Sequence, residues 1–380
     1  MRVLIVIRAL KVGGIERVAS ILADTYAKNG HECHLLYFKE KKHPIAPESS
    51  DVILHQFNPS KTARKKAGGL LIELASRIIN IFVRKGYFIP FGWYGGKLFK
   101  EHVKKLESTY GAFDSIIFRG IGSYESMWSF RDTRAIFVIE NVLNYNDSFL
   151  GKLKARLLFS KKKIATVSEG VKEDLLANAS KLSFNPQSVK VITNPCPVES
   201  IHKLMTEKDP DIPGQEYIIN VARLVPQKNH KLLLDAYALT HKTYPLVIVG
   251  DGPLMNELKE HATNLNINHL VTFTGEKKNP FPLMHHAKLF VLSSVHEGLG
   301  IVLLESLACN TPVISTDSHG GVRDIFNQGL EGYLCPPDAQ SLASLIDSTL
   351  DDGCYEPDNA ILDKYRPDNI ANEFLNYAKE

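Results

Sequence analysis

The sequence predicts an α/β protein built from two doubly wound, Rossmann-like domains that face each other across a cleft. Short apolar runs rich in β-branched residues alternate with helix-length segments along almost the whole chain. Such continuous runs are typical of parallel strands buried on both faces, whereas half-exposed strands alternate polar and apolar residues. A chain of 380 residues favours two cores over one, since domains usually hold about 100–200 residues.

The predicted strands fall into two series. The first series comprises Val3–Ile7, His34–Phe38, Val52–Phe57, Ser115–Phe118, Ile136–Glu140, Ile164–Ser168 and Val189–Thr193. The second series comprises Tyr217–Val221, Leu246–Gly250, Val271–Thr274, Leu289–Ser293 and Pro312–Thr316. In doubly wound sheets, ligands bind at the carboxyl ends of the strands.

A proline-rich segment separates the two series. Pro195 and Pro197 are followed by a polar stretch that contains Pro210 and Pro213. Proline cannot continue a strand ladder and biases its predecessor toward extended geometry, so this segment reads as a linker. We therefore predict an N-terminal domain over residues 1–196 and a C-terminal domain over 197–361, with a last helix over about 362–380 that can pack back on the first domain.

Composition indicates a globular protein of a reducing compartment. Apolar residues make up 44% of the chain and charged residues 23%, which is ordinary for a folded domain. The five cysteines are scattered singly, so neither a disulfide framework nor a zinc site is expected. The apolar run near the amino terminus is too short for a secretory core or a membrane span, and it reads as a buried first strand. We expect a cytoplasmic protein.

Two cations follow the first strand of the second series. Arg223 and Lys228 lie between the strand Tyr217–Val221 and a helix expected to begin near Asn229. Cations at the carboxyl end of a parallel strand are placed to clamp an anionic diphosphate. Taken alone, a pair of solvated surface cations is an equal alternative. The next strand leads into Gly250, Asp251 and Gly252, whose glycines permit a sharp turn and close backbone approach, with Pro253 expected in the first turn of the following helix. As an isolated turn it says little, but between a strand and a helix it is a candidate edge of a nucleotide-binding pocket.

The strongest pattern is the stretch that carries Glu297 and Glu305. A strand ends at Ser293 or Ser294, and a helix is expected to start near Gly300. Carboxylates in such a loop and helix accept hydrogen bonds from hydroxyl groups, and the amides of the loop and helix N-terminus suit phosphate. The alternative for Glu305 is a surface helix position, but a carboxylate beside Ile301–Leu304 needs a partner, which favours a functional role.

A second glycine loop lies near the amino terminus. Gly13 and Gly14 follow the first strand and open a helix, so they can form a loop that faces an anion or a sugar. The segment lacks the G-x-G-x-x-G spacing of dinucleotide sites, which disfavours a hydride-transfer cofactor and a dehydrogenase.

Together these motifs resemble the retaining glycosyltransferases of family four, which have the GT-B fold. The resemblance spans about the whole chain. It is carried by RLVPQKNH from Arg223, GDGP from Gly250, and the E-x7-E stretch from Glu297 to Glu305. The segments GGIERV from Gly13, TVSEGVKEDL around Ser168 and ITNP ending at Pro195 are also similar.

The resemblance implies a role for each matching residue. Arg223 and Lys228 would bind the donor diphosphate, Glu305 the nucleotide ribose, and Glu297 the hydroxyls of the donor sugar. The loop of Gly298, Leu299, Gly300 and Ile301 would supply amides to sugar and phosphate. The donor would be a nucleotide sugar, by family tendency a UDP-sugar, and no metal or other cofactor is expected because cations and helix dipoles carry the leaving-group charge.

One position departs from the family pattern. Members often carry a histidine after the strand that here ends at Glu140 and Asn141, and this sequence has no histidine between His102 and His202. Glu140 is therefore the candidate polar contact to the donor sugar in the N-terminal domain. A carboxylate that merely faces solvent at the strand end is the alternative.

The charge distribution predicts a membrane-facing first domain. Residues 1–195 hold 31 Lys and Arg against 17 Asp and Glu, and the rest holds 14 against 25. Residues 61–105 mix eleven cations with many aliphatic and aromatic residues, and residues 152–163 add six cations. Such mixtures are typical of surfaces that bind anionic lipid. No nucleic-acid-binding motif accompanies them. We therefore expect peripheral association with the inner face of the plasma membrane. The alternative is that the charge asymmetry reflects only random variation in surface composition.

The sequence thus predicts a glycosyltransferase that moves a sugar to a lipid-linked or polysaccharide acceptor, as in bacterial surface polysaccharide or lipopolysaccharide synthesis. Two alternatives remain open: a nucleotide-sugar epimerase of the same fold, which would need no acceptor, and a non-catalytic subunit that binds nucleotide sugars.

Overall fold

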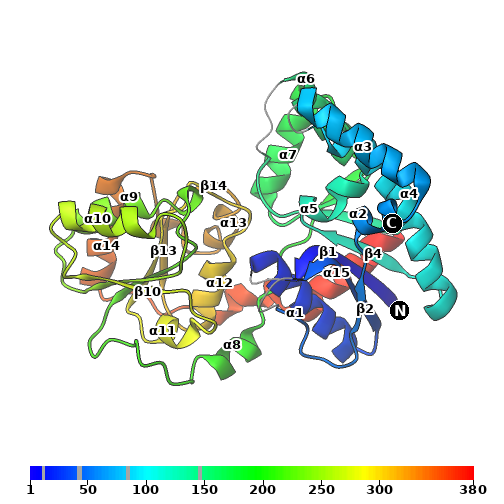
Figure 1. Ribbon diagram of the computed structural model, residues 1–380. Helices are drawn as coiled ribbons and strands as arrows, with labels where there is room; N and C mark the ends of the chain where they lie inside the picture. The colour runs from blue at the N-terminus through cyan, green and yellow to red at the C-terminus, as the bar shows by residue number, and fades with distance from the viewer. Residues whose placement is uncertain (11–12, 41–44, 83–85, 144–147) are drawn as a thin grey trace. The chain divides into compact units, whose positions relative to one another are not determined.

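The computed structural model describes residues 1–10, 13–40, 45–82, 86–143 and 148–380. The chain divides into two compact units (Figure 1). The first unit consists of Met1–Pro195 together with Pro367–Glu380, and the second of Cys196–Arg366. The observed division therefore lies one residue before the predicted one, and the returning C-terminal segment begins at Pro367.

The first unit is built on one parallel sheet. Within its described residues the strand order is β3-β2-β1-β4-β5-β6-β7, with the long strand β1 near the middle. All pairings are parallel, and β4 and β5 are buried along their whole length. The strands are β1 (Arg2–Leu10), β2 (Glu32–Glu40), β3 (Ile53–Gln56), β4 (Ser115–Arg119), β5 (Ala135–Ile139), β6 (Lys163–Thr166) and β7 (Ser188–Val191).

Helices connect these strands. They are α1 (Gly14–Lys28), α2 (Pro59–Arg64), α3 (Ala67–Phe82), α4 (Phe88–Tyr110), α5 (Ile121–Tyr124), η1 (Glu125–Met127), α6 (Phe149–Phe159) and α7 (Glu169–Lys181). Local sequence sets several of their starts: the Ser168 hydroxyl, for example, accepts a hydrogen bond from the backbone N–H of Val171 at 3.1 Å and caps α7.

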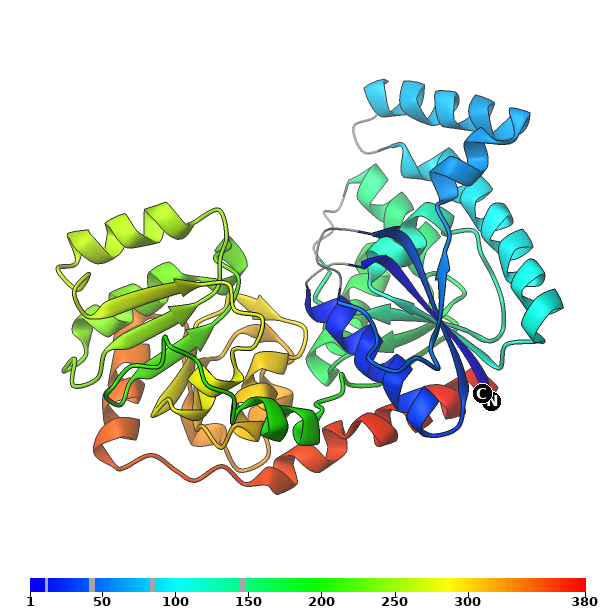
Figure 2. The same ribbon diagram turned by 60° about the horizontal axis from the view of Figure 1, so that its bottom comes forward.

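The last helix, α15 (Pro367–Lys379), belongs to the first unit and lies beside α1 (Figure 2). The Tyr26 hydroxyl donates to the carbonyl oxygen of Ala371 at 3.0 Å, and the Tyr377 hydroxyl donates to that of Ile164 at 3.2 Å. Phe374 is fully buried. The core of the first unit is thus completed by the C-terminal segment.

The second unit repeats the architecture, and all of its residues are described. Its strand order is β10-β9-β8-β11-β13-β15. These strands are β8 (Ile218–Val221), β9 (Leu246–Val249), β10 (Val271–Gly275), β11 (Leu289–Leu292), β13 (Val313–Thr316) and β15 (Leu334–Cys335). A separate two-stranded ribbon pairs β12 (His296–Glu297) with β14 (His319–Gly320).

Helices cover this second sheet as well. They are α8 (Val198–Leu204), η2 (Pro226–Lys228), α9 (His230–Leu239), α10 (Met255–Asn264), α11 (Phe281–His285), α12 (Ile301–Ala308), α13 (Arg323–Phe326), η3 (Glu331–Tyr333), α14 (Ala339–Asp351) and η4 (Asn359–Tyr365). Leu233, Leu234 and Leu258 pack with apolar residues of β8 and β9 in one core.

Every strand of the two predicted series is present, and the α/β class with two Rossmann-like units is confirmed. The sequence reading missed β12, β14 and β15, because a two-residue strand is too short to show a period. One placement was wrong: Pro253 does not lie in the first turn of the next helix, since α10 begins at Met255 and Pro253 occupies the preceding turn.

Candidate functional site

The central feature of the second unit is an ion pair between Lys228 and Glu297. Lys228 ends η2, which follows the carboxyl end of β8, and Glu297 lies in β12, beyond the carboxyl end of β11. Asn229 has a left-handed backbone with φ of 48°, which turns the chain sharply from η2 into α9. Strands β8 and β11 are neighbours, so their carboxyl ends bring together two groups that are far apart in the sequence.

The Glu297 carboxylate is held from several sides. Its side chain is only 8% exposed, and the Ser294 hydroxyl donates to Oε1 at 2.6 Å. The backbone is fixed as well, because Glu297 pairs with Gly320 in the ribbon and the N–H of Gly321 donates to its carbonyl oxygen at 3.0 Å. A buried carboxylate with one cation and one hydroxyl partner is well oriented to accept further hydrogen bonds from a ligand's hydroxyl groups.

Backbone contacts hold the loop that carries Arg223 against the turn formed by Gly250, Asp251 and Gly252. The N–H of Leu224 donates to the carbonyl oxygen of Asp251 at 2.9 Å. A methyl group added at Gly250 would lie 1.9 Å from the carbonyl oxygen of Ala222, and one added at Gly252 would lie 2.4 Å from that of Leu224. These glycines are therefore required by the close approach of two loops of the protein itself.

Arg223 itself is free to reach a ligand. Its side chain is exposed, and within the described residues it forms no ion pair. Asp251 is also exposed, and its carboxylate accepts a hydrogen bond from the N–H of Gly252 at 2.7 Å. The loop thus presents one uncompensated cation at the carboxyl edge of the sheet.

Helix α12 places Glu305 within the protein. Gly300, with φ of 86°, precedes the helix, and Gly298, Leu299 and Gly300 are buried while Ile301 is partly exposed. Glu305 is buried, so the alternative of a surface helix position is wrong. Helix α12 packs against α8 near the start of the second unit. Burial, and then the negative charge of the Glu305 carboxylate, raise the pKa of the Cys196 thiol.

In the first unit, Glu140 forms a buried ion pair that the sequence reading missed. Arg119 ends β4 and is 1% exposed. Its Nε lies 2.8 Å from Glu140 Oε1, and its Nη2 donates to Glu140 Oε2 at 2.9 Å and to Asn194 Oδ1 at 2.5 Å. The alternative of a solvent-facing carboxylate is therefore wrong. The available signal was a single charged residue at the end of an otherwise apolar strand.

Burial and pairing oppose each other in this pair. Burial raises the pKa of the Glu140 carboxyl group, and the adjacent Arg119 guanidinium and the Asn194 amide lower it. One hydrogen bond, from Arg119 Nη2 to Glu140 Oε2, and the close ion-pair contact of Nε with Oε1 hold the carboxylate against the guanidinium. Glu140 is thus a fixed group, and its side chain keeps 11% exposure.

The amino-terminal glycines lie at the same sheet edge as Glu140. Gly13 precedes α1, and a methyl group added at Gly14 would meet nothing within 4 Å. A methyl group added at Gly120, which follows β4, would lie 2.9 Å from Ile15 Cδ1 and 3.9 Å from Glu140 Cγ. The start of α1, the end of β4 and Glu140 therefore meet at the carboxyl edge of the first sheet.

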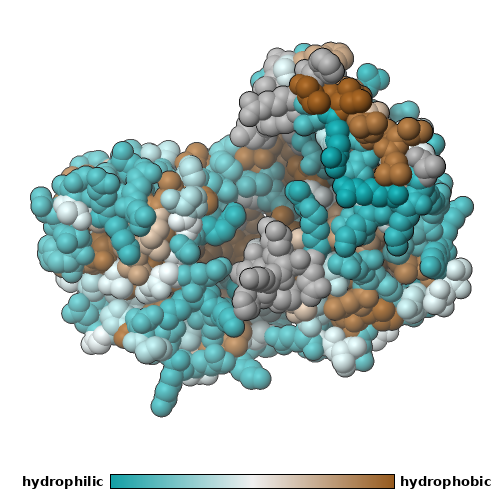
Figure 3. All heavy atoms as spheres, in the orientation of Figure 1, coloured by the Kyte–Doolittle hydropathy of each residue, from teal (hydrophilic) through white to brown (hydrophobic). Residues whose placement is uncertain are grey.

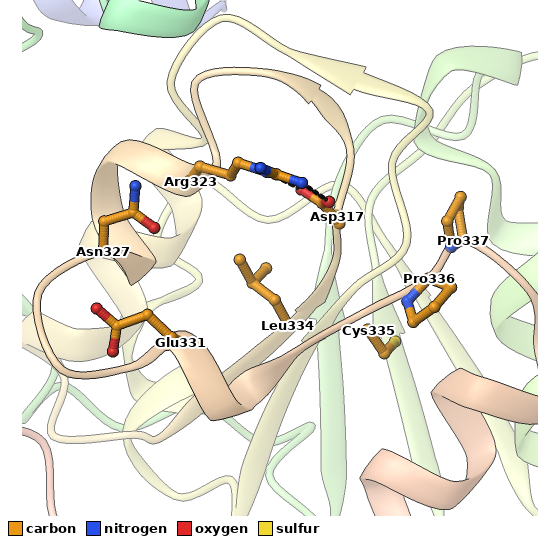
Figure 4. Close-up of a pocket in the computed structure, with 8 residues that line it drawn as sticks. All are labelled: Asp317, Arg323, Asn327, Glu331, Leu334, Cys335, Pro336 and Pro337. Atoms are coloured by element: carbon orange, nitrogen blue, oxygen red, sulfur yellow. Dashed lines mark hydrogen bonds and ion pairs between the residues drawn. The ribbon is translucent and has the colours of Figure 1, made fainter.

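A pocket of about 410 Å³ lies beside β13 and β15 in the second unit (Figure 4). Arg323 and Asp317 form an ion pair on its wall, where Arg323 Nε donates to Asp317 Oδ1 at 2.7 Å. Glu331 and Asn327 also line it. None of the site residues predicted from the sequence lines this pocket, so it is separate from the Lys228–Glu297 pair. Across the described residues, no three His, Cys, Asp or Glu side chains are grouped to hold a metal ion.

Comparison with solved structures defines the class of fold. Over 100% of this chain and 98% of the other, the chain superimposes with a TM-score of 0.65 and 17% identity on HepE from Anabaena in complex with UDP. The two parallel sheets, each with helices, are those of the GT-B fold. Residues 205–366 match the family model Glycosyl transferases group 1.

Two curated relatives are similar over part of their length. One is the N-acetylgalactosamine-N,N'-diacetylbacillosaminyl-diphospho-undecaprenol 4-alpha-N-acetylgalactosaminyltransferase of Campylobacter jejuni, 34% identical over 55% of this chain and 55% of the relative. The other is the lipopolysaccharide 1,6-galactosyltransferase of Salmonella typhimurium, 27% identical over 46% of this chain and 48% of the relative. The chain thus spans about half the length of the curated relatives it matches.

Proposed function

We propose that the chain is a retaining glycosyltransferase that takes a sugar from a UDP-sugar and transfers it to a lipid-linked or polysaccharide acceptor in bacterial surface glycan synthesis. The observation that carries the proposal is the Lys228–Glu297 pair, with the exposed cation of Arg223 nearby in sequence, at the carboxyl edge of the second sheet. The family model matched by residues 205–366 and the UDP bound to the HepE neighbour support the same donor class.

The donor site would work by electrostatic stabilisation of the leaving group. The diphosphate carries negative charge that grows as the glycosidic bond breaks, and Arg223 and Lys228 would neutralise it. The amides that open α12 at Gly300 and Ile301 would bind phosphate, so no metal ion is needed in this proposal. Glu305 would accept hydrogen bonds from the ribose.

Glu297 has two roles in this scheme. In the structure its carboxylate neutralises Lys228. When the donor binds, the diphosphate would compete for the Lys228 ammonium. The carboxylate of Glu297 would then accept hydrogen bonds from hydroxyl groups of the donor sugar. Ser294 would keep that carboxylate in place throughout.

The first unit would supply the remaining polar contact. Glu140, held by Arg119, occupies the strand end where a polar contact to the sugar is expected. The backbone of Gly13 and Gly14 would face the ligand there, and the space around Gly14 is open, since a methyl group added to it would meet nothing within 4 Å. The acceptor class rests on the curated relatives, whose names include a diphospho-undecaprenol-linked glycan and lipopolysaccharide. With such an acceptor the enzyme would act at the inner face of the plasma membrane.

Thermal unfolding with a panel of nucleotides and nucleotide sugars tests the donor site. A ligand at about 100 times Kd adds roughly 2.7 kcal/mol of stability, which gives a clear rise in Tm. We expect a rise with UDP and with one UDP-sugar, lost in Arg223→Ala and in Glu305→Ala. Lys231→Ala, which removes another exposed cation close to Lys228, is the matched control and should keep the rise.

Product analysis separates the three functions. A glycosyltransferase releases UDP in proportion to an added lipid-linked acceptor, whereas an epimerase converts the UDP-sugar without acceptor. A non-catalytic binding subunit raises Tm with the nucleotide sugar and yields no product. Absence of any nucleotide-dependent rise in Tm would refute the donor site.

A further inference from the structure

Helix α3 turns its small and polar side chains toward the protein and its apolar side chains outward, which is the reverse of an ordinary surface helix. Its inward positions include Gly69, Glu73 and Ser76, which are small or polar, and all three are buried. Its large apolar side chains point outward, with Leu71 70% exposed and Ile81 77% exposed. The exposed apolar residues are Leu70, Leu71, Leu74, Ile78, Ile79 and Ile81. At 3.6 residues per turn, all of these except Ile79 fall within an arc of about 100°.

Specific contacts fix this orientation. Arg64 binds the Glu73 carboxylate with two hydrogen bonds, Nη2 to Oε1 at 2.6 Å and Nε to Oε2 at 2.7 Å, and Arg77 Nη2 donates to Oε1 at 3.0 Å. A methyl group added at Gly69 would lie 2.1 Å from the carbonyl oxygen of Ala63 in α2. Rotating the leucines inward would break these ion pairs and force larger side chains against α2. The outward apolar stripe is therefore built into the fold.

Cations lie next to the stripe. Lys61, Arg64, Lys65 and Lys66 in or next to α2 are exposed, as is Arg77 in α3 itself. Glu73 is buried and paired, and the exposed carboxylate of Glu101 is paired with Lys66. Figure 3 shows apolar residues gathered along α3 (α3 labelled in Figure 1), with hydrophilic residues next to them. The surface thus joins an uncovered apolar face to a net positive border.

We infer that α3 is an interfacial helix that lies in the plane of an anionic lipid monolayer and inserts its apolar stripe between the headgroups. An apolar arc flanked by cations matches the boundary between acyl chains and anionic headgroups. A helix of this kind lies on the membrane, and none of the described helices is both long and apolar enough to cross one. A protein partner or a second copy of the chain would gain less from a border of like-charged cations.

The structure also narrows the surface predicted from residues 61–105 and 152–163. Phe88 and Phe91 are buried in the first unit and cannot reach lipid, and the same holds for Lys162 and Lys163 in the second cluster. Arg84 and Lys85 lie outside the described residues. The lipid contact is thus assigned to α3 with the cations around α2. At the start of α4, Phe88 and Phe91 belong to the core, whereas Trp93 is 45% exposed.

Co-sedimentation of the full chain with lipid vesicles tests the inference. We expect binding to vesicles that mix phosphatidylcholine with phosphatidylglycerol, weaker binding to pure phosphatidylcholine, and at least about a tenfold loss of affinity in Leu71→Asp/Ile78→Asp. Leu239→Asp is the matched control, because Leu239 is an exposed leucine of the second unit, and it should bind as the wild type does. Equal binding by the α3 variant and the wild type would overturn the inference.

A second variant reports insertion directly. The chain has two tryptophans, so Leu74→Trp in a chain whose Trp93 and Trp128 are replaced by Phe gives one fluorophore on the stripe. Its emission should shift to the blue and be quenched by brominated acyl chains when vesicles are added. An unshifted emission, or a dimer in solution that the α3 substitutions dissolve, would contradict the lipid assignment. The rise in Tm with UDP, measured on the same variants, tells failure of this inference from failure of the donor site.

Discussion

The ammonium group of Lys228 and the carboxylate of Glu297 form an ion pair although they lie 69 positions apart in the sequence. Both groups are mostly buried, with 16% and 8% of their side chains exposed. Each group neutralises the other, so neither the buried cation nor the buried carboxylate is left uncompensated.

Replacement of Lys228 by Ala should lower turnover about 100- to 1,000-fold, because the leaving diphosphate loses one stabilising charge. Product formation from UDP-sugar and acceptor measures this, with Lys231→Ala as the control. Near-normal turnover would contradict the assigned role.

Replacement of Ser294 by Ala should weaken kcat/KM by about tenfold, because hydrogen bonds to charged groups are worth about 1.5–3 kcal/mol and Lys228 still orients the carboxylate. The hydroxyl donates only to Glu297 Oε1, at 2.6 Å. A matched substitution is Ser293→Ala, whose hydroxyl contacts the carbonyl oxygens of Lys228 and Asn229. If Ser294→Ala has the smaller effect of the two, Ser294 does not position Glu297.

Replacement of Arg119 by Met should destabilise the first unit by about 3–5 kcal/mol, since it leaves the Glu140 carboxylate buried without its cation. Urea unfolding measures the loss. The double variant Arg119→Met/Glu140→Leu should recover most of it, because no buried charge then remains. Additive losses in the double variant would show that the two side chains do not act as a pair.

Stability should fall as the pH drops from about 6.5 toward 4, because His34 and His55 are held neutral in the folded protein. Burial lowers the pKa of both rings, that of His55 to about 4, while Glu32 opposes the shift at His34. Over this window the unfolded chain binds more protons than the folded one, so protonation favours unfolding. His34 Nδ1 lies 2.7 Å from His55 Nε2, which makes a second charge there costly.

The pH effect is measured as the difference in Tm between pH 8 and pH 5. His55→Phe should reduce that difference relative to the wild type, and His241→Phe, at an exposed histidine of the second unit, should leave it unchanged. A wild-type Tm that is higher at pH 5 would contradict the assigned sign.

Removal of divalent metal should leave UDP binding and turnover unchanged, because Arg223, Lys228 and the first amides of α12 are proposed to carry the phosphate charge. The measurement is the rise in Tm with UDP, and the turnover rate, before and after EDTA. A loss that added Mg²⁺ restores would refute a metal-independent site.

Strands such as β5, β9 and β11 were predictable because each is a continuous apolar run. The loops that carry Arg223, Lys228 and Glu297 were proposed from the rule that ligands bind where such strands end. The partners of these residues were not predictable in the same way. Arg119 pairs with Glu140 across neighbouring strands, and only strand order brings the two together.

The orientation of helix α3 also depends on tertiary contacts that the local sequence does not reveal. The mixture of cations and apolar residues over 61–105 predicted a lipid-binding surface, but it did not say which face of a helix there would be buried. The outcome is set instead by Gly69 against α2 and by the pairing of Glu73 with Arg64. These contacts depend on tertiary structure, so the local pattern could not reveal which face would be buried.

The position of α15 has a consequence for the order in which the protein forms. During synthesis the seven strands of the first sheet emerge before the second unit, yet Phe374 and Tyr377, which complete that core, are translated only after the second unit. The core of the first unit therefore stays incompletely packed while the second unit is translated, although domains generally fold as they emerge. Packing of α15 is thus a late step in folding, and a truncated α15 would destabilise the first unit, which is translated first.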